Sequence, residues 1–144
     1  MNYTANEAEN FVNEIKDRIN TDEVDVVIFP NFVSLDRVSN ILDDTKIMLG
    51  AQNVYFEDKG AYTGETSVDM LISVNAKYCI VGHSERRQYF GETDEIVNKK
   101  AKKLLEKDLN PIICVGETLE QRNEGKMYEI VKSQIVNSLN GITE

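Results

Sequence analysis

The sequence contains no tryptophan, a single histidine (His83) and only two cysteines among its 144 residues. With one histidine and no Cys-x-x-Cys pair, the spacings that usually bind zinc are missing, so we predict no transition-metal site. Basic residues are also scarce, because 16 lysines and arginines stand against 25 acidic residues and the net charge is -9. Nucleic-acid binding depends on a basic surface, so we expect no nucleic acid as a partner.

Long apolar runs are absent as well. A helix that spans a bilayer needs about 20 consecutive apolar residues, and no stretch of this chain comes near that length. The first ten residues are polar and acidic, whereas a secretory signal starts with basic residues and continues with apolar ones. We therefore expect a soluble, cytoplasmic protein with no membrane partner.

The two cysteines fit a reducing compartment. Cys79 and Cys114 each lie inside a short apolar run, which indicates small buried side chains. A disulfide between them is the weaker alternative, because cytoplasmic proteins rarely contain one.

Enough apolar material remains for one core. Hydrophobic residues make up 41% of the chain and charged residues 28%, a balance typical of a folded domain. Domains commonly contain about 100 to 200 residues, so we expect a single domain over residues 1–144.

Short apolar runs alternate with helical periodicity along the chain. Four runs have the length and composition of buried strands: Val24–Phe29, Ile47–Ala51, Tyr78–Val81 and Ile112–Val115. Helical spacing is found over Ala5–Ile19, from Ser34, over Ser67–Val74, over Asp94–Lys107 and from Tyr128 to Gly141, and a long polar loop is predicted over Gln52–Thr66. The alternation predicts an α/β fold with a parallel sheet, either open or part of a closed barrel.

Functional side chains in parallel α/β folds gather at the carboxyl ends of the strands. The segment Gly82–Arg87 (GHSERR) follows the third strand and places the only histidine beside three charged residues. Ser84 can cap a short helix there, and a helix N-terminus beside His83 would keep its imidazole neutral and ready to donate to a carbonyl oxygen. The alternatives are a structural, hydrogen-bonded histidine and a solvated ion-pair cluster.

Two further acidic residues are candidates for a general base. Glu92 and Glu117 follow the third and fourth strands. We interpret both as structural, one near a helix start and one beside a turn, each accepting backbone hydrogen bonds. No GxGxxG or Walker-type turn occurs, so an open phosphate-binding domain of another family is a weak alternative.

The segment Val81–Arg87 (VGHSERR) resembles the histidine segment of the triosephosphate isomerase family. GAQN at 50–53, GAYTGETS at 60–67 and CVGETL at 114–119 extend the resemblance over essentially the whole chain. The resemblance implies a partial (β/α)8 TIM barrel with about half of the eight strand–helix units, lacking the first strand and the last three units. Such a barrel needs about 250 residues, so we expect the natural polypeptide to be longer.

The same resemblance implies roles for individual residues. His83 matches the electrophile that polarises the substrate carbonyl, and a neutral imidazole at this position is already established for the family. Glu85 matches a carboxylate that supports the catalytic lysine. Thr63 matches the tip of a loop that crosses a dimer interface, whereas Glu65 and Arg86 match a charge pair between subunits. The catalytic lysine, the general-base glutamate and the phosphate-binding loops have no match in this chain.

The implied activity interconverts dihydroxyacetone phosphate and glyceraldehyde 3-phosphate through an enediol. It belongs to glycolysis and gluconeogenesis, uses no cofactor and is carried out by a homodimer. Because the base and the lysine are not matched, we expect the chain alone to be inactive. The alternative is a non-catalytic half-barrel that self-associates or complements another chain through its outer strands and the Asn53–Thr66 loop.

Overall fold

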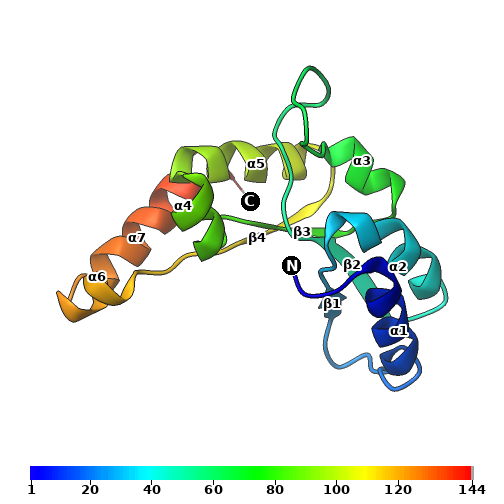
Figure 1. Ribbon diagram of the computed structural model, residues 1–144. Helices are drawn as coiled ribbons and strands as arrows, with labels where there is room; N and C mark the ends of the chain where they lie inside the picture. The colour runs from blue at the N-terminus through cyan, green and yellow to red at the C-terminus, as the bar shows by residue number, and fades with distance from the viewer. Residues whose placement is uncertain (144) are drawn as a thin grey trace.

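A four-stranded parallel sheet crosses the middle of the molecule in the computed structural model, which describes residues 1–143 (Figure 1). Its strands, in spatial order, are β1 (Val26–Ile28), β2 (Ile47–Ala51), β3 (Tyr78–Val81) and β4 (Asn110–Ile113). The predicted α/β class is therefore confirmed.

The strand order answers the question that the sequence leaves open. An open, doubly wound sheet reverses its strand order at a switch point, whereas here each strand pairs with the next one in the chain. In register, Val26 lies opposite Ile47, and Val81 lies opposite Ile113. A parallel sheet that runs in one direction without reversal is the arrangement of a barrel wall.

Helices connect the strands. They are α1 (Ala5–Ile15), the 3₁₀ helix η1 (Phe32–Ser34), α2 (Leu35–Leu42), α3 (Val68–Ser73), α4 (Ser84–Phe90), α5 (Asp94–Glu106), α6 (Leu119–Asn123) and α7 (Met127–Ser138). Figure 1 shows the chain as an arch, with most helices along its outer side and the strands along its inner side. Among the described residues, no helix combines the length and apolar character that a membrane span requires.

The first helix is shorter than its periodicity predicts. Thr4 and Glu7 form the capping box that the sequence indicates at its start. The helix ends at Ile15 rather than at Ile19, yet Ile19 still packs against the core. The apolar spacing therefore indicates which side chains face the core, and Ile19 faces it from a position beyond the end of the helix.

The strands also differ at their ends from the predicted ranges. β1 omits Val24, which is largely exposed. β4 begins at Asn110 and includes Pro111, two residues expected only to precede it. Proline, which has no N–H to donate, is tolerated at a sheet edge, and β4 is an edge strand of the sheet that the described residues form.

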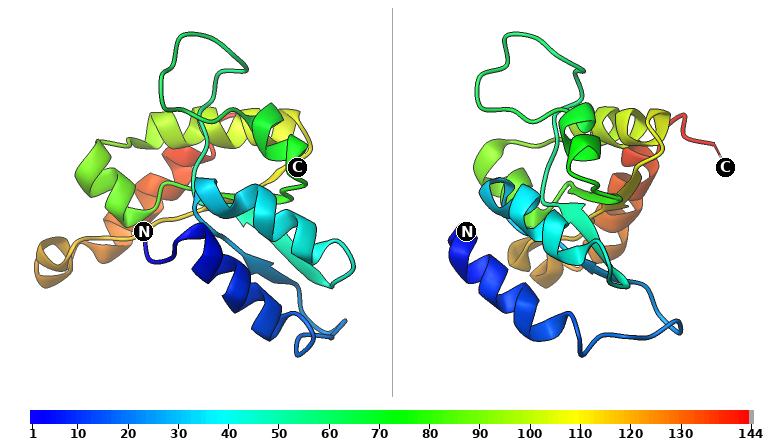
Figure 2. Two further views of the ribbon diagram at one scale, coloured as in Figure 1. Left: turned by 45° about the vertical axis from the view of Figure 1, so that its right-hand side comes forward. Right: turned by 90° about the vertical axis from the view of Figure 1, so that its right-hand side faces the viewer.

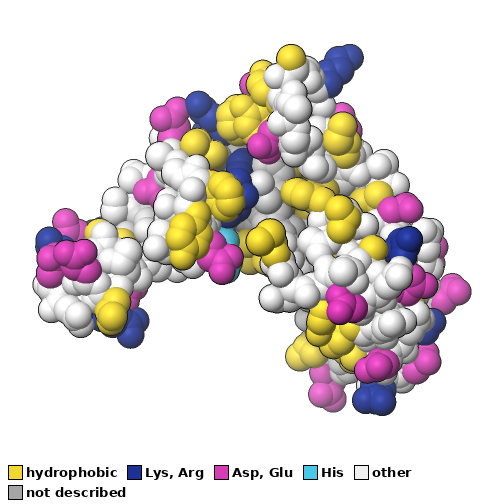
Figure 3. Space-filling model, in the orientation of Figure 1, with side chains coloured by type: hydrophobic (Ala, Val, Ile, Leu, Met, Phe, Trp, Pro, Cys, Tyr) yellow, Lys and Arg dark blue, Asp and Glu magenta, His cyan; other side chains and the backbone are white. Residues whose placement is uncertain are grey.

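In the last third of the chain, the sequence analysis predicts neither helix α6 nor the exposure of the apolar side chains of α7. Helix α6 follows a capping box of Thr118 and Gln121, a signal that is legible in the sequence. Helix α7 has the predicted periodicity, but its apolar side chains are largely uncovered, and Tyr128 is 75% exposed. Figure 3 shows hydrophobic side chains exposed around the hollow between the two arms of the arch.

The core lies between the sheet and its covering helices. Its fully buried members include Val12, Val38, Leu71, Val81, Val97 and Leu104. Cys79 is buried in β3, as predicted, whereas Cys114 is only half-buried because it lies beyond the end of β4. Both thiols are free.

Candidate active site

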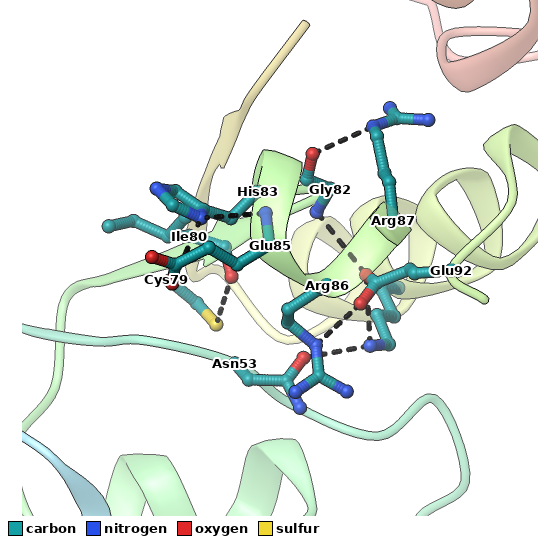
Figure 4. Close-up of polar contacts among 10 residues, drawn as sticks. Asn53, Cys79, Ile80, Gly82, His83, Glu85, Arg86, Arg87 and Glu92 are labelled. Carbon is teal, nitrogen blue, oxygen red and sulfur yellow. Dashed lines mark hydrogen bonds and ion pairs between the residues drawn. The ribbon is translucent and has the colours of Figure 1, made fainter. Parts of the chain in front are cut away.

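His83 lies at the carboxyl end of β3 and is the N-cap of α4. Its Nδ1 accepts a hydrogen bond from the backbone N–H of Glu85 at 3.3 Å (Figure 4). The expectation that Ser84 caps this helix is wrong, because Ser84 is the first helical residue and the imidazole itself takes the capping position. The side chain remains 45% exposed, so a ligand can reach it.

This contact determines which ring nitrogen can donate. A neutral imidazole carries one proton, and the nitrogen that accepts a hydrogen bond is the unprotonated one. Since Nδ1 of His83 accepts from Glu85, the proton lies on Nε2. The Glu85 carboxylate is 3.7 Å from the same Nδ1, beyond hydrogen-bond distance. When the imidazole is uncharged, His83 therefore presents its Nε2–H as a donor at the strand end.

Gly82 allows the chain to turn from the strand into the helix. Its φ of +73° is in the left-handed region, which favours glycine. A Cβ atom there would lie 3.0 Å from Val97 Cγ2 and 3.1 Å from the Cys114 carbonyl oxygen. Space and backbone conformation both require glycine directly before the histidine.

Both peptide groups of Gly82 are bound by charged side chains (Figure 4). Its N–H donates to Glu92 Oε1 at 3.2 Å, and its carbonyl oxygen accepts from Arg87 Nε at 2.8 Å. Arg87 also donates to Asp94 Oδ1 at 2.6 Å and to the Cys114 carbonyl oxygen at 3.2 Å. The guanidinium of Arg87 thus joins the carboxyl ends of β3 and β4.

Glu92 is the centre of a buried polar network. Besides Gly82, it accepts from Arg86 Nε at 2.6 Å and from Lys100 Nζ at 3.0 Å. Lys100 also donates to Asn53 Oδ1 at 2.7 Å, so the network reaches the loop after β2. Two cations therefore surround one carboxylate, and the carboxylate side chain itself is only 2% exposed.

The pKa shifts follow from this arrangement. Burial raises the pKa of Glu92, but Lys100 and Arg86 outweigh it and hold that pKa below its ordinary value of 4.5. Burial lowers the pKa of Lys100 below 10.5, although Glu92 opposes the shift. Glu92 is thus an ionised, fully engaged structural carboxylate, as its position near a helix start indicates.

Glu117 is engaged in the same way. Arg122 Nε donates to its carboxylate at 2.7 Å. A hydrogen bond from its own backbone N–H, together with this guanidinium, holds the pKa of Glu117 below 4.5. The structural interpretation is the one these contacts favour for Glu117, whose carboxylate is committed to an arginine.

The residues that the resemblance assigns to a dimer interface lie on the loop before α3 and on α4. Thr63 is exposed on the loop, which projects from the body in Figures 1 and 2. Glu65 and Arg86 line one groove of about 220 Å³, together with Tyr55, Phe56 and Phe90. The structure therefore brings Glu65 and Arg86 to one surface, but within the chain the carboxylate bonded to Arg86 is Glu92.

The loop itself is held against α5. Tyr55 stacks on Phe56 with ring centroids 4.4 Å apart, and Lys99 Nζ lies 5.6 Å from the centre of the Phe56 ring. Lys103 Nζ lies 3.5 Å from the Asp58 carboxylate. These contacts position the loop without a second chain.

The buried network is the part of the site that sequence reasoning missed. Lys100 lies on the buried, otherwise apolar face of α5, together with Val97, Ala101 and Leu104. A charged residue in an apolar stripe is rarely buried unless it is paired, and this signal could have found the network. Among residues 1–143, no group of three His, Cys, Asp or Glu side chains is placed to hold a metal ion.

Parallel strands in unbroken order, helices outside them and a histidine donor at their carboxyl ends define a β/α-barrel chain with a candidate active site at the usual end. The family model for triosephosphate isomerase matches residues 1–144. The chain belongs to the triosephosphate isomerase family.

Individual relatives agree with this assignment. The chain is 49% identical over 143 residues to the triosephosphate isomerase of Thermoanaerobacter sp. (strain X514), and 50% identical over 142 residues to that of Alkaliphilus metalliredigens (strain QYMF). These alignments cover 99% of this chain but 58% and 57% of the relatives. The crystal structure of triosephosphate isomerase from Bartonella henselae superimposes with a TM-score of 0.93 at 36% identity, over 99% of this chain and 60% of that one. The fold is thus a partial TIM barrel, and the chain spans somewhat more than half the length of the relatives it matches.

Proposed function

We propose that this chain is the histidine-bearing part of a triosephosphate isomerase, which interconverts dihydroxyacetone phosphate and glyceraldehyde 3-phosphate through an enediol. The observation that carries the proposal is the cap on α4: Nδ1 of His83 accepts from the Glu85 N–H and leaves Nε2–H as the donor. A neutral catalytic imidazole is already established for this family, and this contact provides a physical basis for it.

His83 acts in this proposal on the substrate carbonyl. When a base removes the proton from the neighbouring carbon, negative charge develops on the carbonyl oxygen. A preorganised N–H donor stabilises that charge more in the transition state than in the ground state, which lowers the barrier. Glu85, whose carboxylate is exposed beside the ring, is proposed to support the catalytic lysine.

The base and the lysine are proposed to come from outside this sequence. Glu92 and Glu117 are both committed to arginines, and Glu92 also to Lys100. The net charge of -9 repels a dianionic substrate at long range, so its capture depends on local positive groups and on screening by salt.

A coupled isomerase assay on the 144-residue chain tests this division of the site. We expect no turnover above that of the His83→Ala variant, because a donor without a base cannot form the enediol. A catalytic difference between the two purified chains would show that this chain contains a complete site, and the proposed division would be wrong.

We also propose that the chain forms a homodimer through the projecting loop, with Thr63 at its tip and with Glu65 and Arg86 paired across the interface. The aromatic contacts that order the loop, and the groove that Glu65 and Arg86 share, support this. As an enzyme of glycolysis and gluconeogenesis, the protein is proposed to be cytoplasmic.

Sedimentation of the Thr63→Arg variant tests the interface. We expect it to shift the protein toward monomer, whereas Thr143→Arg, a matched change at another exposed threonine, leaves the assembly unchanged. Equal sedimentation of both variants would remove Thr63 from the interface.

The alternative function is a non-catalytic half-barrel that associates with itself or with another chain. The uncovered apolar side of α7 favours some form of association. Stable association together with failure to bind a phosphorylated enediol mimic, in the natural polypeptide that carries this chain, would favour this alternative.

A further inference from the structure

Two groups of one residue compete for Nδ1 of His83. The backbone N–H of Glu85 lies at 3.3 Å and requires an unprotonated Nδ1. The carboxylate of Glu85 lies 3.7 Å from the same atom and would be a partner only for a protonated Nδ1. A small displacement of the ring therefore exchanges one tautomer for the other, and with it the nitrogen that can donate to a ligand.

The position of the ring depends on the peptide groups before it. The carbonyl group of Gly82 forms the peptide bond with the nitrogen of His83, and Arg87 Nε holds that oxygen at 2.8 Å. Glu92 holds the N–H on the other side of Gly82 at 3.2 Å. These two contacts, which we term the Gly82 clamp, bind the only residue between β3 and the histidine.

Both members of the clamp are themselves fixed. Glu92 is bound by Lys100 and Arg86, and its carboxylate is shielded from water. Arg87 is bound to Asp94 and to the carbonyl group after β4. A charged side chain that already has its partners keeps its geometry without reorganising, which suits it to orient a neighbouring group.

We propose that Glu92 and Arg87 are positioning residues that hold Gly82 and thereby keep the His83 ring on the N-terminus of α4 in its Nε2-protonated form. This role rests on the proposed function only in so far as that function uses the Nε2–H donor. Neither residue touches the substrate; each acts through Gly82 on the ring.

Nitrogen NMR of the ring tests the proposal directly, because His83 is the only histidine and gives unambiguous signals. The spectra are recorded on the 144-residue chain in mildly alkaline buffer, where imidazole is uncharged. We compare the Glu92→Gln/Lys100→Met pair, which keeps an acceptor for the Gly82 N–H, with the Glu92→Leu/Lys100→Met pair, which removes it. Lys99→Met, an exposed change on the same helix, is the control.

The parent chain, the control and the glutamine-containing pair are expected to show an unprotonated Nδ1 and a protonated Nε2. In the leucine-containing pair the two nitrogen signals are expected to move toward each other, and adding Glu85→Gln, which removes the competing carboxylate, is expected to reverse the movement. Unchanged ring signals in a folded leucine-containing pair would overturn the proposal.

Hydrogen exchange of the parent chain supplies a second test that needs no substitution. If the clamp holds the ring, the amides of Gly82 and Glu85 are released by the same opening and exchange with similar protection. Exchange of the Glu85 amide about tenfold or more faster than that of Gly82 would show that the ring is released while the clamp is closed, and would overturn the proposal.

Neither readout involves turnover, so the two hypotheses can fail separately. A clamp that sets the tautomer, together with full activity of His83→Ala in the natural polypeptide, would contradict the proposed function alone. An unclamped ring, together with lost activity of His83→Ala, would contradict the positioning role alone.

Discussion

Lys100 Nζ lies 3.0 Å from Glu92 Oε1, and the two side chains are only 4% and 2% exposed. The pair joins the middle of α5 to the turn before that helix, and through Glu92 it reaches the N–H of Gly82. A buried ion pair gains little over a well-packed apolar pair, because both charges lose their hydration. Its removal from one side only is costly, since it leaves a buried charge without a partner.

Glu92→Gln is therefore expected to lower the free energy of unfolding by about 3 to 5 kcal/mol. The change leaves the Lys100 ammonium buried without a negative charge beside it, because its remaining acceptors are neutral amide oxygens such as that of Asn53. Urea unfolding measures the loss. The matched control is Glu95→Gln, which breaks the exposed pair with Lys99 on the same helix and is expected to change little. Equal losses in both variants would contradict the importance of burial.

The same carboxylate is expected to make stability depend on pH. The folded-state pKa of Glu92 is below its ordinary value of 4.5. At a pH near these values, the folded chain therefore binds fewer protons at Glu92 than the unfolded chain does. Its stabilising contribution is present above the unfolded value of about 4.5 and is lost as the pH falls through the lower folded pKa. Urea unfolding between pH 7 and 3 measures this loss, and the Glu92→Leu/Lys100→Met pair is expected to show a shallower decrease. A decrease as steep as that of the parent would contradict the assignment.

Gly82→Ala is expected to destabilise the fold more than Gly91→Ala does. Both glycines have left-handed φ values, +73° and +63°, which cost a non-glycine residue about 1 to 3 kcal/mol. Only at Gly82 would the new Cβ also lie 3.0 Å from Val97, whereas nothing lies within 4 Å at Gly91. Gly116→Ala, without positive φ or close neighbours, is the control. Thermal unfolding ranks the three variants, and equal midpoints for Gly82→Ala and Gly91→Ala would contradict the contact with Val97.

The fold could be predicted from the sequence where local patterns decide it. The four strands occur at their predicted places, and the capping box of Thr4 fixes the start of α1. The ends of elements could not be predicted as well, because Ile19 is partly buried against the core without being helical. Strand order, which separates an open sheet from a barrel wall, depends on contacts between distant segments and leaves no periodicity in the sequence.

The candidate site could be predicted in part. The strand end and the lone histidine single out His83, but the cap formed by its ring depends on a rotamer that composition does not specify. Glu92 and Lys100 are eight residues apart on neighbouring elements, and Asn53 is 47 residues from Lys100. Their convergence is a property of the folded sheet, so the sequence offers only the charged residue in the apolar stripe of α5.

The two thiols are expected to differ in reactivity. Burial raises the pKa of Cys79 to about 12, so almost no thiolate forms at neutral pH. Burial also raises the pKa of Cys114, but that side chain is partly exposed. Alkylation at pH 8 followed by mass spectrometry is expected to label Cys114 first and Cys79 only after unfolding. Prior labelling of Cys79 would show that the strand β3 is not buried as described.

The central claim is that the Nε2–H of His83 is the electrophile of a triosephosphate isomerase. The most direct test is the steady-state kinetics of the natural polypeptide that carries this chain, with and without His83→Ala. The account predicts isomerase activity in the parent and a decrease of kcat by about 100- to 1,000-fold in the variant, the cost of removing one preorganised donor to a developing oxyanion. Full activity without the imidazole, or a natural polypeptide with no isomerase activity, would contradict it.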